Sequence, residues 1–132
     1  MAAADRALDV AQSLSTLAGQ LQTRITAAQN AGHDMSASVT ALADMNAKIS
    51  DANTKANAAT SEVAGLKPDN GDQTVMQSNL ATMKDARSKI QAAQQDLIAA
   101  RKDAGTIVKA VMAIKVSANA SSSATTNAST SA

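Results

Sequence analysis

The sequence predicts an all-α fold: three long helices in an antiparallel coiled-coil bundle, the third helix longest, followed by a disordered Ser/Thr-rich C-terminal tail. Three observations predict it: the composition, an apolar repeat with alternating steps of three and four residues, and two turn signals that divide the repeat into three segments. The 132 residues include 32 Ala and no Phe, Tyr, Trp or Cys, so a core can be built only from Ala, Leu, Ile, Val and Met. Ala, Leu and Met are strong helix formers, which disfavours an all-β fold.

The first predicted helix covers about residues 3–31. Its apolar positions are Ala7, Ala11, Leu14, Ala18, Leu21, Ile25 and Ala28. This spacing places them on one face of a helix, as in a coiled coil. The pattern stops at Gly32, which can take the left-handed conformation that ends helices, and Asp34 can accept hydrogen bonds from the N–H groups of a following helix. We therefore expect a tight turn between two helices here.

The second predicted helix covers about residues 35–66. Its apolar stripe runs through Leu42, Met45, Ile49, Ala52, Ala56, Ala59, Val63 and Leu66. Two acid and base pairs stand four residues apart, Asp44 with Lys48 and Asp51 with Lys55, a spacing that stabilises an exposed helix face slightly. Gly65 and Pro68 end the helix, and Asp72 is the expected N-cap of the next one.

The third predicted helix covers about residues 72–116 and has the most regular stripe. Its apolar positions are Met76, Leu80, Met83, Ala86, Ile90, Ala93, Leu97, Ala100, Ala104, Ile107, Val111 and Ile114. Three consecutive segments with a repeat of about 3.5 residues predict a left-handed antiparallel bundle over residues 1–116. From residue 117 the chain is Ser, Thr, Asn and Ala only, so residues 117–132 are expected to form a flexible tail. The triplets at Asn119 and Asn127 fit either glycosylation or a plain spacer.

The expected helix lengths predict a projecting segment. If the second and third helices pair directly across their turn, Leu66 lies beside Gln73 and Met35 lies beside Ala104, so that residues 105–116 extend beyond the bundle. That segment carries Ile107, Val108, Val111, Met112 and Ile114. An apolar stripe is seldom left in water, so we expect a homo-oligomer formed through the C-terminal part of the third helix. A first helix that continues upstream of Met1 and fraying of the last turns remain as alternatives.

No pattern of residues indicates catalysis, a cofactor or a metal. His33 is the only histidine, and it stands in a turn without several converging ligands. Glu62 is the only Glu, and neither it nor the ten Asp show a pair facing an apolar pocket, which acid and base catalysis requires. The Met residues fall on or next to the apolar stripes and are expected in the core. We therefore expect a protein that is not an enzyme and that has no catalytic, cofactor-binding or metal site.

Charge and hydropathy disfavour two further classes. Residues 84–115 hold seven Lys or Arg against three Asp, but no aromatic residue accompanies them for base stacking, so nucleic acid is not an expected partner. No stretch approaches the roughly 18 consecutive apolar residues of a transmembrane segment. The first residues lack the features of a signal peptide, so a signal, if the protein is exported, has been removed.

The turn at residues 31–37, the Ala/Asp/Lys-rich helix after it and the long last helix leading into a Ser/Thr tail resemble a family. It comprises uncharacterised, Ala-rich, exported coiled-coil proteins of candidate phyla radiation bacteria, in which a Gly-X-Asp-X-Ser turn joins two helices. Here the turn reads Gly32, His33, Asp34, Met35, Ser36. The resemblance covers residues 10–132 and implies a structural role at the cell envelope or surface, although this chain has one Glu where such helices are Glu-rich.

The expected function is that of a non-catalytic structural or protein-interaction module: a self-associating helical rod of the bacterial cell envelope or surface, with a possible protein partner there. One alternative is an amphipathic-helix lipid-binding protein that opens its bundle on an apolar surface. Such helices usually insert Trp or Phe, and both are absent here. Another alternative is a fragment of a larger coiled-coil protein.

Overall fold

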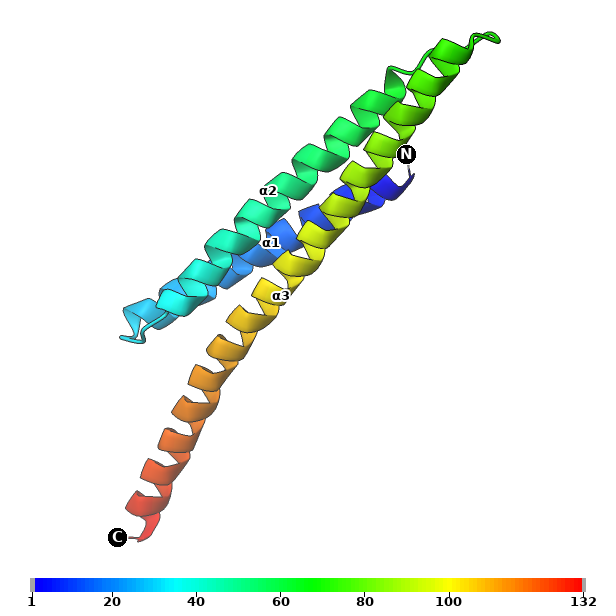
Figure 1. Ribbon diagram of the computed structural model, residues 1–132. Coiled ribbons are helices and arrows are strands. Elements are labelled where there is room, and N and C mark those ends of the chain that lie inside the picture. The colour runs from blue at the N-terminus through cyan, green and yellow to red at the C-terminus, as the bar shows by residue number, and fades with distance from the viewer. Residues whose placement is uncertain (1, 132) are drawn as a thin grey trace.

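The computed structural model describes residues 2–131, and for residues 2–114 it describes the side-chain surroundings as well. It contains three helices, α1 (Ala2–Asn30), α2 (Ser36–Ala64) and α3 (Gln73–Ser131), and no strand occurs in the part of the chain described. Figure 1 shows an elongated bundle in which consecutive helices run in opposite directions. α3 packs more extensively against α2 than against α1. The predicted all-α fold with three helices, the third longest, is confirmed.

The core is a continuous seam of small side chains along the bundle. Of the 21 buried apolar residues, eleven are Ala, and the rest are Leu, Ile and Met at the predicted positions of the repeat. Because Ala adds little volume, the helix axes approach closely and each turn buries little apolar area. The three largest fully buried side chains are Ile25, Met45 and Ile107. The stability of such a bundle must therefore come from its length.

The connection between α1 and α2 is a tight turn, as predicted. Gly32 has a left-handed φ of 91°. The N–H of His33 donates to the carbonyl of Ala28 at 3.0 Å, which is the hydrogen bond that closes a helix C-terminus of the Schellman type. Asp34 Oδ1 accepts from the backbone N–H of Ser36 at 3.0 Å and from its hydroxyl at 2.7 Å. These bonds end one helix and start the next within five residues.

The connection between α2 and α3 is longer and lies along α3. Asn70 (φ 50°) and Gly71 (φ 88°) reverse the chain. Asp72 Oδ1 then accepts from the N–H of Thr74 at 2.9 Å and caps α3, as predicted. The side-chain amide of Asn79 donates to the carbonyl of Lys67 at 2.7 Å and ties the connection to the helix.

The register between α2 and α3 differs from the expected one. Lys55 pairs with Asp96 at 3.3 Å, and Glu62 pairs with Lys89, so the residue numbers of both pairs add to 151. Since both helices rise equally per residue, the end of α2 is level with about residue 87 and its start with about residue 115 of α3. The expectation that Leu66 lies beside Gln73 was wrong, because residues 65–72 extend along the first turns of α3 before the chain reverses direction.

This register leaves the first turns of α3 beyond the other two helices. Ala3 of α1 lines one groove together with Val63 at the end of α2 and the α3 residues from Met83 to Gln94, so α1 begins at the level of that stretch of α3. The residues of α3 before that level, Gln73–Met83, extend past the N-terminus of α1, as Figure 1 shows. At the other end, α3 runs on past the α1–α2 turn.

The C-terminal boundary of α3 also differs from the expected one. The backbone of α3 is helical to Ser131, whereas we expected the helix to end at residue 116. Residues 117–131 contain neither Gly nor Pro, so nothing in the local sequence stops a helix. Helices without packing partners are marginal in water, and the flexibility of this segment stays a prediction.

Candidate functional site

The predicted self-association residues lie beside the bundle and not beyond it. Ile107 is completely buried in the core. Val108, Val111 and Ile114 are partly buried against the core, and only Met112 is well exposed, at 56%. The expectation that the chain projects from residue 105 was wrong for this stretch, because the register brings the start of α2 level with about residue 115. Self-association stays a prediction, but a projecting apolar segment at residues 105–116 no longer supports it.

The remaining predicted features lie as follows. His33 is exposed in the α1–α2 turn. Among the described residues, no group of three or more His, Asp or Glu side chains is placed to hold a metal ion. Within the same part of the chain, no helix is long and apolar enough to cross a membrane. Glu62 is not isolated, because it pairs with Lys89 across the α2–α3 interface.

The main concentration of charged groups is a row of carboxylates and lysines between α2 and α3, which we call the charged seam. Most of its members recur every seven residues, on α2 from residue 44 and on α3 from residue 89, so they fall on one flank of the coiled-coil interface, and Asp85 lies one turn before Lys89. They are Asp44, Lys48, Asp51, Lys55, Glu62, Asp85, Lys89, Asp96 and Asp103. They form three successive groups, each with two carboxylates and one Lys.

The middle group is centred on Lys55. Its ammonium lies 2.5 Å from Asp51 on the same helix and 3.3 Å from Asp96 across the interface. Burial, reinforced by the hydrogen bond with Asp51, raises the pKa of Asp96. Hydrogen bonds from Asp96 and Lys55 lower the pKa of Asp51. The proton that this group takes up first therefore lies on Asp96, and Lys55 stays charged because its own pKa is raised by Asp51.

The largest change in pKa occurs in the group nearest the α1–α2 turn, which contains Asp44, Lys48 and Asp103. Burial, together with the hydrogen bond and the negative charge of Asp44, raises the pKa of Asp103 to about 6, against the attraction of Lys48 and Lys102. The Oδ2 atom of Asp103 is buried and has no hydrogen-bond partner among the described residues. A carboxyl group in these surroundings is favoured in its neutral form, which donates to Asp44.

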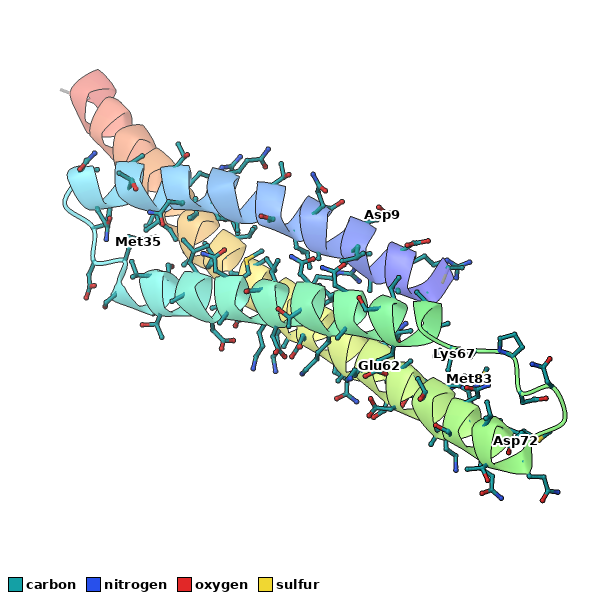
Figure 2. All side chains as sticks on the ribbon, turned by 90° about the horizontal axis from the view of Figure 1, so that it is seen from above. Asp9, Met35, Glu62, Lys67, Asp72 and Met83 are labelled. Atoms are coloured by element: carbon teal, nitrogen blue, oxygen red, sulfur yellow. The ribbon has the colours of Figure 1, made fainter. Side chains whose placement is uncertain are left out.

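The third group lies nearer the α2–α3 connection, and its lysine lies on α3 instead of α2. Here the cation is Lys89 of α3, which pairs with Glu62 of α2 and lies 2.9 Å from Asp85 of its own helix. Figure 2 shows Glu62 on α2, with Met83 and then Asp72 farther toward the tip of the hairpin. Because the lysine changes helix between the groups, a slip of one heptad would bring Lys against Lys or carboxylate against carboxylate.

The charged seam fixes register and is not arranged for acid and base catalysis. Its carboxylates face one another and lysines, and Lys55 and Lys89 are each committed to ion pairs within the bundle. Sequence reasoning found Asp51 with Lys55 as a pair along one helix, but it missed the partners across the interface. The heptad spacing of Asp44 with Asp51 and of Asp96 with Asp103 was the available signal.

These features define the class: an antiparallel three-helix bundle with an alanine-rich core, in which a repeated charge pattern lies between α2 and α3. Comparison with protein-family models, with curated proteins and with solved structures gave no match to this chain. The resemblance to exported coiled-coil proteins therefore stays a prediction.

Proposed function

We propose that the protein is a non-catalytic structural module, a stiff helical rod that acts by spacing and by contact with other proteins. The observation that carries the proposal is the charged seam. Partly buried ion pairs contribute little net stability, but they select one register over its alternatives. A repeated device for register is of use to a protein whose length and straightness matter.

Two further observations support this reading. The alanine-rich core runs along the whole bundle as one continuous cluster, as expected for an element that transmits position. Apart from Asp34, which lies in the α1–α2 turn, the described groups with shifted pKa values lie at the α2–α3 interface and engage one another there. A reactive site would instead turn such groups toward a place where a substrate can bind.

The test is a distance measurement between two spin labels. Thr40→Cys in α2 and Ser88→Cys in α3 provide exposed, unique thiols because the chain has no Cys of its own. The register puts these positions about 35 Å apart along the bundle axis, from a rise of 1.5 Å per residue. A rod gives one narrow distance distribution, and labelled protein is diluted with unlabelled protein to remove contributions between molecules. A broad distribution would contradict the proposal.

The same labelled protein tests the lipid-binding alternative. Addition of anionic phospholipid vesicles leaves the distance unchanged if the protein is a rod. An amphipathic-helix protein that opens on a lipid surface unfolds the hairpin between α2 and α3 and lengthens the distance. Vesicle binding with a lengthened distance would replace the structural proposal by lipid binding.

We also propose the bacterial cell envelope or surface as the compartment, with a protein partner there. This part rests on the resemblance of the turn Gly32 to Ser36 and of the Ser/Thr-rich end. Fractionation of cells that express the complete gene with an epitope tag tests it. Recovery of the tag in the cytoplasm alone would contradict it.

A further inference from the structure

The first turns of α3 carry an apolar face that no helix of the bundle covers. Met76, Leu80 and Met83 are exposed by 43%, 56% and 45%. Met76 and Met83 occupy the same position of the repeat as Ile90 and Leu97, which are buried farther along the helix, and Leu80 lies between them on the same side. The difference arises because α1 begins beside the stretch of α3 from Met83 to Gln94, so the place that α1 fills farther along the bundle is vacant beside Met76 and Leu80.

The opposite side of the same turns is covered. The connection between α2 and α3 lies against it, with Leu66 and Lys67 beside Val75 and Asn79. The uncovered side forms a shallow groove lined by Gln77, Leu80, Ala81, Met83, Lys84 and Arg87. One defined face of one helix is therefore left for a partner, and Met76 and Met83 on it continue the spacing of the core.

We propose that this face binds the same face of a second copy of the chain, with the two α3 helices antiparallel and a two-fold axis that passes beside Leu80, between Asn79 and Leu80. The proposal deepens the structural function above, since it names the contact that the rod makes. In this arrangement Leu80 meets Leu80 of the second copy, and Met76 meets Met83 of the second copy. Flexible Met side chains adapt well to such a contact. The result is a two-fold dimer with a bundle pointing away from each side.

Charge complementarity selects the second copy and the antiparallel direction. Asp72 lies at one end of this face and Arg87 at the other, and no ion pair among the described side chains engages either one. The numbers of Asp72 and Arg87 add to 159, as do those of Met76 and Met83. The two-fold axis that pairs the Met residues therefore also sets Arg87 level with Asp72 of the second copy. A parallel pairing would set Arg87 against Arg87 and Asp72 against Asp72.

The length of the face agrees with the same arrangement. The stretch Gln73–Met83 is about 16 Å long at 1.5 Å per residue. The second copy supplies a helix of this same length, which fills the vacant place in line with α1. Three half-exposed side chains per copy make a small interface, so the dimer is weak, with a dissociation constant on the order of 10 to 100 µM.

Sedimentation equilibrium over about 10 to 500 µM, which brackets this affinity, tests for the dimer. Wild type shows a monomer–dimer equilibrium, and Leu80→Gln weakens it by about tenfold or more, as expected for loss of a central apolar contact. The matched control is Ile98→Gln, because Ile98 is more exposed, at 65%, but lies outside the face. Ile98→Gln changes the dissociation constant by less than about twofold. A wild type that stays monomeric, or equal effects of both variants, overturns the proposal.

Disulfide formation between single-cysteine variants tests the direction. A mixture of Met76→Cys and Met83→Cys proteins forms the mixed disulfide faster than either variant forms its own dimer. Leu80→Cys alone also forms a dimer readily, and Ile98→Cys does not. Faster pairing of Met76→Cys with itself would indicate a parallel contact and overturn the two-fold arrangement.

Two charge variants test the proposed ion pair. Arg87→Gln removes one partner, and Asp72→Ser removes the other while keeping a residue that can cap α3. Each variant weakens the dimer by about twofold to fivefold, as expected for ion pairs at a rim. The double variant weakens the dimer no more than either single variant, because both variants remove the same ion pair. Additive effects of the two variants overturn the pairing of these residues. A rod confirmed by spin labels but monomeric in sedimentation would end this inference and leave the proposed function standing.

Discussion

Asp103 faces Asp44 across the α2–α3 interface, one heptad along from the pair formed by Asp96 and Asp51. Two neighbouring carboxylates repel each other when both are ionised, and burial makes the ionised form still less favourable. The pKa of Asp103 is raised to about 6 for these reasons. The interface that sets the register of the bundle therefore also holds the carboxyl group that takes up a proton in mild acid.

We predict that the protein is more stable at pH 4.5 than at pH 7.5. Asp103 has its folded pKa raised to about 6 from an ordinary 3.8, so the folded state binds its proton more tightly. The resulting stability is fully present below about pH 4 and is lost as the pH rises through 6, with a size of about 1 to 2 kcal/mol. Asp96 adds to the effect in the same direction. Urea unfolding at constant ionic strength measures it, and equal or greater stability at pH 7.5 would contradict it.

The low-pH side of this profile has the opposite slope. Asp34 and Asp51 have pKa values below their ordinary range because they accept hydrogen bonds in the folded state. Their contribution is lost as the pH falls below about 4, so stability passes through a maximum between about pH 4 and 5. Asp103→Asn removes the slope between pH 4.5 and 7.5, whereas Asp85→Asn at the exposed end of the seam leaves it in place.

We predict that Lys55→Gln makes the dependence on pH steeper. Lys55 is the cation that lies between Asp51 and Asp96, and its attraction holds the pKa of Asp96 down against burial. Without it the pKa of Asp96 rises further, and less stability remains at neutral pH. Titration of the carboxyl carbons by NMR follows Asp96 directly. An unchanged titration of Asp96 in the variant would show that the ion pair does not form in solution.

We predict that Ile90→Ala destabilises the bundle by about 2 to 4 kcal/mol, because it leaves a cavity in a core of small side chains. Ile90 is 5% exposed, whereas Ile98 on the same helix is 65% exposed. Ile98→Ala is the matched control, with an expected change within about 0.5 kcal/mol. Urea unfolding of both variants decides the matter, and similar losses in the two would refute the core assignment.

We predict that removal of residues 118–132 leaves the melting temperature unchanged, since the segment consists of Ser, Thr, Asn and Ala only and has no large apolar side chain with which to pack. Removal from residue 107 onward is the contrasting truncation, because it deletes the fully buried Ile107. Circular dichroism of both proteins against temperature gives the answer. A clear loss of stability in the shorter deletion would mean that the C-terminal segment docks on the bundle.

Local features of the chain were predictable from the sequence. Gly32 and Asp72 end and begin helices by backbone conformation and hydrogen bonding to near neighbours, so their roles follow from a few residues. The buried positions of each helix followed from the repeat in the same way. The candidate site was predictable only in part: Asp51 with Lys55 could be found along one helix, but the pairing of Lys55 with Asp96 depends on two distant segments.

The sequence by itself determined three helices, their caps and their apolar faces, because helix formation and capping act over a few residues. The tertiary structure alone decided the register between α2 and α3. A heptad repeat packs almost as well after a shift of one repeat, so apolar spacing leaves several registers close in energy. The charges that distinguish them lie on different helices and act only when the helices meet. That choice buried Ile107, which we had expected to project, and exposed Leu80, which we had placed in the core.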